Sequence, residues 1–368
     1  MIDSVIIKGN HRERNEFIYS LTRIRPGEMY RQRLISDAAR LLNNSIYYER
    51  VQPPRVIFTP WNTAKITLEV RRKRAGKFDL LLGLLPPDQN NDKLQFTGTV
   101  DMLFVSPFRM GEILQFKYDK LTSTSSRLQI ELRAPHVLRT PYQFEGELNI
   151  FKQQEDFQNR FFRLGGQYAF SPFFAAGFNY RDRNSNLLDV SAYATDSIKG
   201  PPQLDGTQRM YGIGFNYEQL DYRLNPTRGM TLLMEVRLGQ RSIRKNFRLP
   251  GEIYENLPEE LPVKEVVFSG HWYKQLFPRH VLHLGQQTYW LGQEQVFRND
   301  QMQVGGARSI RGFTENQFFT NFLASFTAEY RLLLERDSYL MLFGDYAYLE
   351  NAVDREILRP LGIGLGMN

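Results

Sequence analysis

One loop stretch carries a cation whose placement constrains the rest of the chain. Gly305-Gly306 is followed by Ile310-Arg311-Gly312-Phe313, between the strand-like segments Val281–Leu291 and Phe322–Leu334. The two adjacent glycines favour positive φ or close backbone approach, so we expect a shaped loop. The flanking segments alternate apolar and polar residues as the strands of a membrane barrel do, and a guanidinium that faces lipid is costly. Arg311 is therefore predicted to point into a lumen and to bind carboxylates there.

Two acidic residues downstream are the candidate partners. Glu329 lies on the polar face of segment 322–332, and Asp345 lies opposite the apolar face of segment 339–349. Successive side chains of a strand point to opposite faces, so both carboxylates are predicted on the lumen side of neighbouring strands. The lumen is expected to be wet, so losing these ion pairs should cost a modest amount of stability, nearer to that of a surface pair than to that of a buried one. The same pattern also fits two ordinary wall charges beside an ordinary loop, and the pattern alone does not separate the two interpretations.

Residue types that serve catalysis or metal binding form no recognisable constellation. The chain has no cysteine and five histidines. His280 and His283 are three residues apart on a predicted strand, so they face opposite sides and cannot share a metal. Neither a Gly-x-Ser-x-Gly motif, an HExxH motif nor a phosphate-binding loop is present. We therefore expect no enzyme activity, no metal and no cofactor.

Length and composition are compatible with one large barrel and one small domain. The chain has 368 residues and a mean hydropathy of −0.45. No apolar run reaches the ~18–20 residues of a transmembrane helix. A transmembrane barrel tolerates such a hydropathy because only alternate residues face lipid. The aromatic content of 13% fits aromatic girdles at the membrane interfaces, a composition that a soluble all-β protein can share.

Basic charge is concentrated at the start of the chain. The first 75 residues hold 15 Lys and Arg against 7 Asp and Glu. The run Arg71–Arg74 lacks the interleaved aromatic residues of a protein that binds single-stranded nucleic acid. We therefore expect no nucleic-acid partner and predict a solvated basic face near lipid headgroups.

Residues 1–75 are predicted to form a small α+β domain with the order β-α-α-β-β. Strand patterns occupy Val5–Asn10, Val51–Thr59 and Lys65–Val70, and helical spacing occupies Glu16–Ile24 and Tyr30–Tyr47. The pattern changes at residue 76, so the second domain is predicted to span residues 76–368.

Residues 76–368 alternate apolar and polar side chains over about fourteen segments. Phe116 and Val236 belong to apolar faces, whereas Gln115 belongs to a polar face. Charged residues on the polar faces suit a water-filled lumen, which argues against a soluble β-sandwich. The predicted fold class is therefore mainly β, with a transmembrane antiparallel β-barrel after the small domain. No secretory signal follows Met1 and the last segment stops at Asn368, so we expect the chain to be a piece of a longer protein.

Three elements and the N-terminal module resemble the outer-membrane protein assembly family, of the BamA/TamA type. Ile310-Arg311-Gly312-Phe313 matches that family's [VI]-Arg-Gly-[FY] loop motif. Thr327–Tyr330 and Leu342–Asp345 resemble the two strands that carry the acidic partners of its arginine. Asn225-Pro226-Thr227-Arg228-Gly229 resembles the Pro-Thr-Arg-Gly turn that opens a mid-barrel strand. Residues 1–75 resemble a polypeptide-transport-associated (POTRA) domain.

The resemblance implies a sixteen-stranded barrel, of which about fourteen strands are present, so the barrel is expected to be C-terminally incomplete. In the family, the first and last strands meet weakly and form the insertion gate. The candidate gate strand is the first segment of this barrel, with Phe78, Leu80, Leu82 and Gly83. Glycine inside a strand weakens its pairing.

The implied function is the assembly and insertion of β-barrel proteins into the bacterial outer membrane, by strand templating and local bilayer perturbation. The implied partners are unfolded outer-membrane protein clients and outer-membrane lipids, with accessory lipoproteins as further candidates. Residues 1–75 would lie in the periplasm, either binding clients by strand addition or acting as a rigid spacer. The alternative function is a polypeptide-secretion pore of the two-partner type. A barrel enzyme such as a lipase is disfavoured because no nucleophile with an oriented base is evident.

Overall fold

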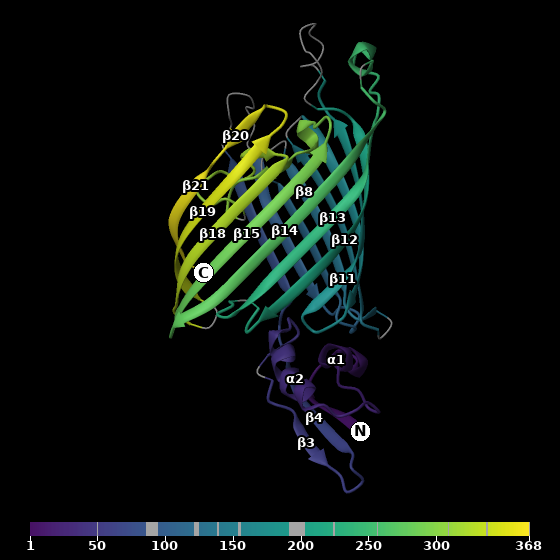
Figure 1. Cartoon of the computed structure of the whole chain (residues 1–368), viewed down its shortest axis with the longest axis vertical. Helices are drawn as coiled ribbons and strands as arrows, with labels where there is room; N and C mark the ends of the chain where they lie inside the picture. Colours follow the sequence, from purple (N-terminus) through teal and green to yellow (C-terminus); the bar gives the residue numbers. More distant parts are fainter. Residues whose placement is uncertain are drawn as a thin grey trace.

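The computed structural model has two parts, an N-terminal domain that ends with a strand at Arg72 and a barrel wall that begins at Lys77 (Figure 1). It describes residues 1–49, 51–85, 95–120, 125–137, 140–153, 156–190, 203–223, 225–255, 257–307, 309–335 and 338–367. Asn368, where the last predicted segment stops, lies outside the described residues. Among the described helices, none combines the length and the apolar character that crossing a membrane requires.

The N-terminal domain is one small sheet with two helices. Its elements are β1 (Ile2–Asn10), α1 (Asn15–Thr22), α2 (Gln32–Asn44), β2 (Tyr48–Glu49), β3 (Arg55–Phe58) and β4 (Ala64–Arg72). The central strand β4 is parallel to β1 and antiparallel to β2 and β3. The predicted order β-α-α-β-β omitted β2, and the strand predicted at Val51–Thr59 begins only at Arg55. Pro53-Pro54 explains the late start, because proline has no N–H to donate to a sheet.

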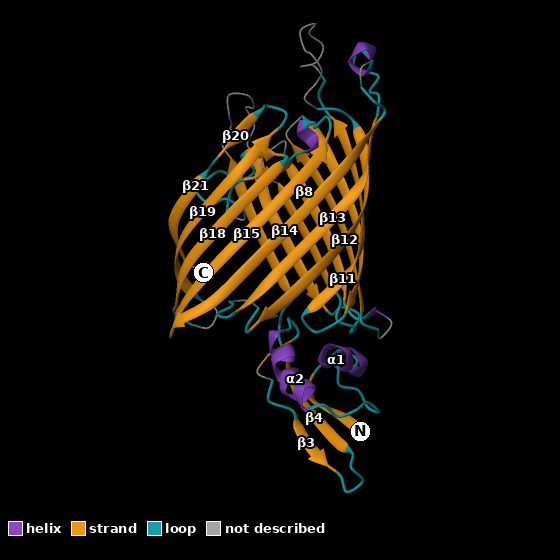
Figure 2. Cartoon of the chain, viewed as in Figure 1, coloured by secondary structure: helices purple, strands orange, loops and turns teal. Residues whose placement is uncertain are grey.

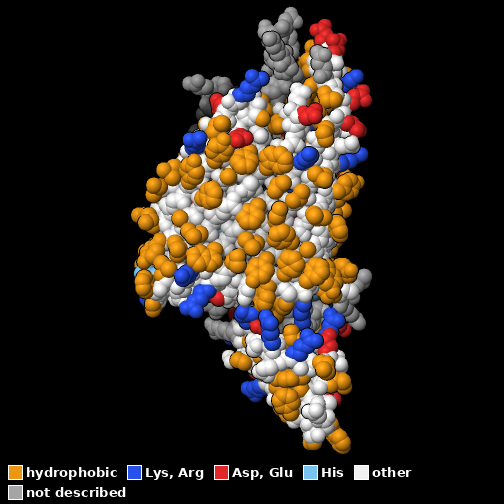
Figure 3. Space-filling view, viewed as in Figure 1, with side chains coloured by type: hydrophobic (Ala, Val, Ile, Leu, Met, Phe, Trp, Pro, Cys, Tyr) orange, Lys and Arg blue, Asp and Glu red, His pale blue; other side chains and the backbone are white. Residues whose placement is uncertain are grey.

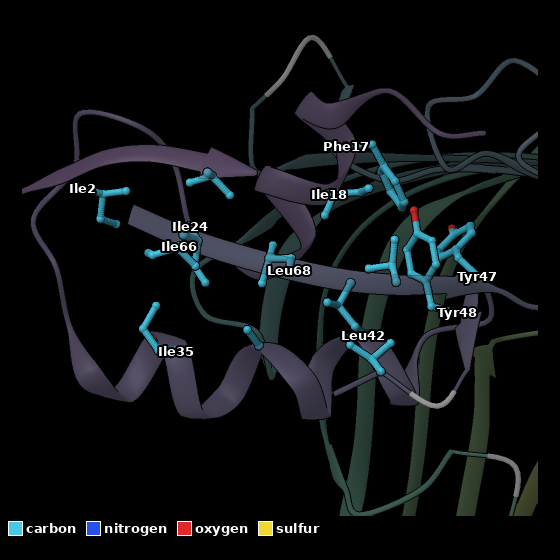
Figure 4. Packing of buried hydrophobic residues seen from close by; sticks show 14 residues of the cluster. Ile2, Phe17, Ile18, Ile24, Ile35, Leu42, Tyr47, Tyr48, Ile66 and Leu68 are labelled. Atoms are coloured by element: carbon cyan, nitrogen blue, oxygen red, sulfur yellow. The ribbon is translucent and has the colours of Figure 1, made fainter. Parts of the chain in front are cut away.

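Apolar side chains from both helices and from the sheet meet in one core (Figure 4). Ile18 on α1, Leu42 on α2 and Leu68 on β4 are fully buried. The carboxylate of Glu13 lies beside this core and is held by the Tyr48 hydroxyl at 3.0 Å and by Arg72 Nε at 3.8 Å. The run Arg71–Arg74 was predicted to be a solvated face. One of its arginines, Arg72, instead pairs with Glu13 inside the domain, so only part of the run faces solvent.

Antiparallel strands, each paired with its neighbours along the chain, form the barrel wall (Figure 2). The strands are β5 (Lys77–Leu85), β6 (Gln95–Val105), β7 (Ile113–Lys120), β8 (Ser126–Ala134), β9 (Tyr142–Gln153), β10 (Phe157–Ala169), β11 (Phe174–Leu187), β12 (Gly206–Leu220), β13 (Gly229–Ile243), β14 (Glu260–Phe277), β15 (His280–Gln293), β18 (Phe322–Leu333), β19 (Tyr339–Asn351), β20 (Glu356–Leu358) and β21 (Leu361–Met367). β20 and β21 both pair with β19, on either side of a break at Pro360. Taken as one interrupted strand, they bring the sheet of 15 strands to the predicted fourteen.

Two short 3-10 helices and one hairpin lie in the described connections between the wall strands. A 3-10 helix, η3 (Gly251–Tyr254), lies between β13 and β14, and a second one, η4 (Arg298–Asp300), follows β15. The hairpin of β16 (Met302–Val304) and β17 (Phe318–Thr320) comes next and carries the loop that contains Arg311.

Apolar side chains face outward across the wall and charged side chains face inward. Val236 lies opposite Ile213 on one neighbouring strand and opposite Val266 on the other, and Val266 lies opposite Trp290. Figure 3 shows the resulting hydrophobic surface over the strands, with charged side chains gathered toward the two ends of the barrel. The adjacent residue Glu235 points the other way and is buried. This alternation is the pattern expected of a wall with lipid on one side and a polar lumen on the other.

The N-terminal domain is attached to the turns at one end of the barrel, here called the domain end (Figure 1). The Tyr47 hydroxyl donates to the carbonyl of Gly111 at 2.5 Å, and Arg23 Nη2 donates to the carbonyl of Ala169 at 2.7 Å. Asn44 donates to the carbonyl of Leu220 at 2.9 Å. Three different turns therefore hold the domain through their backbone oxygens.

A partly buried histidine lies at this junction. His136 lies in the turn after β8, and its ring centroid is 6.2 Å from that of Phe17 on α1. Burial lowers the pKa of His136 to about 4, and the charge of Arg23 acts in the same direction. His136 is therefore neutral in the folded protein at neutral pH.

We predict that Val236→Arg destabilises the barrel, because it places a cation in the middle of β13 on the lipid face. The expected cost is on the order of 2–4 kcal/mol near the bilayer midplane. Gln115→Arg is the control, since Gln115 faces the lumen and donates to Asp101 at 3.0 Å. Urea unfolding in lipid vesicles measures both variants, and equal costs at the two positions contradict the assigned faces.

We predict that His136 makes the protein less stable as the pH falls from about 6.5 to about 4. The unfolded chain binds the proton near the ordinary pKa of 6.5, whereas the folded chain binds it only near 4. The unfolded state thus binds more protons in this window, and the loss approaches about 3 kcal/mol at its acid end. His136→Asn tolerates the positive φ of 56° and removes the titration. Unfolding free energies of the two proteins at pH 7 and pH 4.5 should differ in their pH dependence, and parallel curves contradict the prediction.

Candidate functional site

Arg311 binds both predicted carboxylates inside the barrel. Its Nε and Nη2 donate to the two oxygens of Asp345, each at 2.6 Å, and its Nη1 donates to Oε1 of Glu329 at 2.7 Å. The backbone N–H of Arg311 also donates to Asp345, at 3.1 Å. A planar guanidinium suits such two-point binding of one carboxylate together with single-point binding of another. We call Arg311, Glu329 and Asp345 the Arg311 cluster.

The pleat of the wall places the two acids on the same side. Glu329 on β18 pairs across the sheet with Phe343 on β19, two residues before Asp345. The ring of Phe343 lies under the guanidinium, 3.9 Å from the carbon Cζ of Arg311. Cation–π contact and ion pairs therefore hold the same cation from two directions.

The acids of the Arg311 cluster are more buried than we expected for side chains in a water-filled lumen. The side chains of Asp345 and Glu329 are only 3% and 7% exposed. The two carboxylates are thus covered and do not face an open, wet lumen, whereas the stability cost of losing the pairs stays a prediction. Removing the cation leaves buried acceptors, which costs more than breaking an exposed pair.

Three side chains that the sequence analysis missed hold the acids in position. Arg331 donates to Oε2 of Glu329 through Nε at 2.8 Å and Nη2 at 2.5 Å, and His283 Nδ1 lies 2.9 Å from the same oxygen. The Thr327 hydroxyl donates to Asp345 at 2.9 Å. Glu329 therefore offers Arg311 only its other oxygen. The alternation of side chains along β15 and β18 predicts that His283 and Arg331 point inward. The sequence does not reveal the register of the two strands, which places both side chains beside Glu329.

The loop around Arg311 is held by its own backbone and by an apolar cluster. Gly305 and Gly306 have φ of 122° and 94°, and a Cβ at either position would collide with residues 314–317. Ile310 is 1% exposed and packs with Val304, Leu323 and Leu349 in a cluster that Phe313 also contacts. The apolar residues of the motif thus fix the loop, and Arg311 projects from it toward the acids.

Gly362 on β21 allows the loop to approach the wall. It lies opposite Asp345 in the sheet, and a Cβ there would lie 2.0 Å from the carbonyl oxygen of Arg311. The next glycine along this face, Gly364, leaves the space that the ring of Phe343 occupies. Two glycines therefore replace side chains where the loop and the aromatic ring need room.

The predicted mid-barrel turn, Asn225-Pro226-Thr227-Arg228-Gly229, lies at the domain end and takes no part in the Arg311 cluster. The carboxylate of Asp221 accepts from the backbone N–H of Thr227 and of Arg228, both at 3.0 Å. Gly229 has φ of 117° and begins β13. The turn is next to the contact between Asn44 and Leu220, so its structural role is at the junction with the N-terminal domain.

The candidate gate strand is β5. Phe78, Leu80 and Leu82 are 67%, 55% and 75% exposed, and Gly83 lies opposite Thr97 of β6. β6 is the only partner of β5 among the described residues, and no pairing joins β5 to β21 in the same part of the chain. The two ends of the sheet are therefore open where the structure describes them.

No group of three or more His, Cys, Asp or Glu side chains among the described residues could hold a metal ion. The arrangement of the Arg311 cluster is instead that of an electrostatic anchor, which fixes a loop by means of one cation and two acids.

We predict that Arg311→Ala leaves a folded barrel but releases the loop. The cost should lie between the ~1 kcal/mol of an exposed pair and the ~3–5 kcal/mol of a buried one, since Glu329 keeps Arg331 and His283. Arg311→Lys should restore the anchor only in part, because an ammonium lacks the planar fork. Chymotrypsin cleavage after Phe313 reports the release.

The matched control for this prediction is Arg298→Ala. Arg298 lies on η4, earlier in the same connection, and pairs with Asp354 at 2.6 Å with both side chains 35% exposed. Its loss should change neither stability nor cleavage measurably. Equal cleavage of the two alanine variants contradicts a specific anchoring role for Arg311.

Comparisons with known proteins agree with this architecture. A family model described as the Omp85 superfamily domain matches residues 82–359. A POTRA model, described as a surface antigen variable number repeat, matches residues 1–73. No curated protein matches the sequence.

Solved structures with the same fold include three outer-membrane proteins. BamA from Haemophilus ducreyi lacking POTRA domains 1-3 has a TM-score of 0.54 at 13% identity, over 99% of this chain and 77% of that one. CdiB from Acinetobacter baumannii has a TM-score of 0.62 at 12% identity, over 100% of this chain and 67% of that one. CdiB from Escherichia coli has a TM-score of 0.60 at 13% identity, over 100% and 70%. These likenesses show a shared fold. The family model matches the wall from within β5 to the end of β20, and it shows that the chain belongs to the Omp85 superfamily of outer-membrane β-barrel proteins.

Proposed function

We propose that this protein assembles β-barrel proteins and inserts them into the outer membrane, with its N-terminal domain in the periplasm. The observation that carries the proposal is a free sheet edge held beside a membrane barrel. β1 pairs with β4 on one side only. On its other edge the backbone of Gly27–Glu28 binds Ile2, and no strand covers the rest of that edge among the described residues. Extended chains bind such edges by adding a strand through main-chain hydrogen bonds.

The junction supports this role because it fixes the distance between that edge and the wall. Tyr47, Arg23 and Asn44 bind three separate turns at the domain end, so a chain bound along β1 is delivered to one side of the barrel. The exposed apolar residues of β5 are the complementary feature on the wall, where an incoming strand can pair with backbone groups that β6 does not use. The Arg311 cluster acts by holding its loop inside the lumen.

The mechanism uses binding and templating alone. A client strand first pairs with an edge, and each further strand then has a partner before it meets lipid. This lowers the cost of bringing unpaired backbone groups into the membrane, where each costs several kcal/mol. The expected partners are unfolded outer-membrane proteins and outer-membrane lipids, with accessory lipoproteins as further candidates.

The alternative function is a polypeptide-secretion pore of the two-partner type. Two of the solved structures with the same fold are CdiB proteins, and their TM-scores exceed that of the BamA structure. In this alternative a partner polypeptide passes through the lumen, so it should contact inward-facing residues. In the assembly function the client should contact β1 and β5.

Photocrosslinking in cells that depend on this protein separates the two functions. A photoreactive amino acid at Ile6 on β1 or at Leu80 on β5 should capture outer-membrane protein clients. Ile6 is 45% exposed and Leu80 is 55% exposed, so both can carry the probe. Ile213 is the control, since it is 59% exposed on the outward face of β12 but far from β5 along the sheet.

A probe at Gln287, on the lumen side of β15, tests the alternative. Capture of a secreted polypeptide at Gln287, with normal levels of outer-membrane proteins after depletion, overturns the assembly function. Arg311→Ala should support the growth of the same cells poorly although the barrel folds. Normal growth of that variant contradicts a functional role for the Arg311 cluster.

A further inference from the structure

A second polar region of the lumen, separate from the Arg311 cluster, surrounds a cavity. The cavity has a volume of about 590 Å³ and lies inside strands β8 to β15, under the β16 segment. Arg127 near the start of β8 and Arg183 near the end of β11 line it, so it lies toward the end of the barrel opposite the N-terminal domain. Its volume is in the range of small-molecule sites, ~300–1,000 Å³.

The cavity is lined by more cations than anions. Five arginines and only two acids, Glu235 and Glu265, are among its lining residues. Both acids are already bound by arginines: Glu265 by Arg181 and Arg237, and Glu235 by Arg237 and by Arg163 at 3.0 Å. The acids therefore do not neutralise the remaining positive charge.

Arg183 is a lining cation that has no carboxylate partner in the described part of the chain. Its side chain is buried, and its Nη1 donates to the backbone carbonyl of Asp300 at 2.7 Å. The carboxylate of Asp300 is paired instead with Arg241 at 2.6 Å. Arg183 Nε is buried with no hydrogen-bond partner in the described part of the chain. Burying a cation and a donor in this way is costly unless something pairs with them.

Aromatic rings fix the guanidinium groups on this wall. The carbon Cζ of Arg183 lies 4.6 Å from the ring centroid of Phe161, and that of Arg127 lies 4.8 Å from the ring centroid of Phe151. Stacking orients a guanidinium before any ligand arrives, which reduces the entropy that binding must remove. Because Nη1 of Arg183 is used by Asp300, the edge that carries Nε is the one left for a ligand.

Hydrogen-bond acceptors without partners lie between the two stacked arginines. The amide oxygens of Asn149 and Asn159 line the same cavity and have no donor among the described residues, and neither does the Oε1 atom of Gln301. A ligand that fits must therefore supply an anionic group to Arg183 and several donors to the amides. A phosphate or carboxylate attached to a polyhydroxylated body has both.

We propose that this lumen cavity binds a small acidic sugar ligand, a sugar phosphate or sugar carboxylate, with its anionic group on Arg183 and its hydroxyl groups on Asn149 and Asn159. The ligand enters from the end of the barrel opposite the N-terminal domain. The source is a free sugar or the headgroup of a lipid that carries the same group. The site is independent of the proposed assembly function, because it includes none of the residues of the Arg311 cluster.

Calorimetric titration of the 368-residue chain in detergent micelles tests the proposal. The probes are D-glucose 6-phosphate and D-glucuronate, with D-glucose as the uncharged control and inorganic phosphate as the control for an anion alone. Both acidic sugars should bind more tightly than D-glucose and than inorganic phosphate. Monophosphoryl lipid A in mixed micelles distinguishes the sources: tighter binding of this lipid assigns the site to a headgroup, and tighter binding of the free sugars assigns it to a soluble ligand.

Arg183→Gln should weaken the binding of the acidic sugars roughly 10- to 100-fold, the factor expected for one charge-assisted contact. Asn159→Asp should also weaken it, since a second anion then faces the ligand. The matched control is Arg209→Gln on the neighbouring strand β12, whose side chain is 69% exposed and pairs with Asp182. Heat modifiability on gels verifies that each variant forms a barrel.

Three results would overturn the proposal. The first is the absence of binding by either acidic sugar to the folded wild-type chain. The second is an affinity that is the same in Arg183→Gln and Arg209→Gln. The third is an affinity for inorganic phosphate, or for an acidic peptide, that equals or exceeds that for the acidic sugars.

Discussion

A charged side chain inside a barrel wall needs a partner, and the loop that carries Arg311 is organised by this requirement. The guanidinium meets one acid side-on, a second acid end-on and an aromatic ring face-on. Each of these partners comes from a different residue of the β18–β19 pair, so the position of the cation depends on the register of those two strands. The loop in turn buries the acids. Loop, acids and strand register are therefore one coupled unit and not three separate features.

Much of this unit follows from the sequence, for a simple reason. A strand has a period of two, so the side on which Glu329 and Asp345 lie is set by counting from their apolar neighbours. Because a cation is costly on the lipid face, Arg311 is expected to point inward and to bind inward-facing acids. The same alternation predicted the outward row that contains Val236 and the number of wall strands, since apolar segments and turns are local features of a sequence.

What the sequence did not show depends on distances between strands. His283 reaches Glu329 because β15 and β18 pair in one register, and a shift of one residue would have turned it to the lipid face. The contacts of Tyr47, Arg23 and Asn44 are to backbone oxygens of turns, which no side-chain pattern records. The burial of Asp345 was misjudged because the cover is supplied by the loop and not by the strand that carries the acid. The short strand β2 gave no signal because two residues are too few for a period.

The glycines of β21 have a consequence for the order in which the structure can form. Gly362, Gly364 and Gly366 alternate along the inward face of this strand, and the spaces beside them are filled by Arg311, Phe343 and Met341. The inner surface of β21 is therefore bare backbone, and no side chain of this strand interlocks with the loop. β21 can pair with β19 after the loop is in place without any group having to pass another. The loop can therefore become ordered before the last described strand joins the wall, since no side chain of that strand has to be in place first.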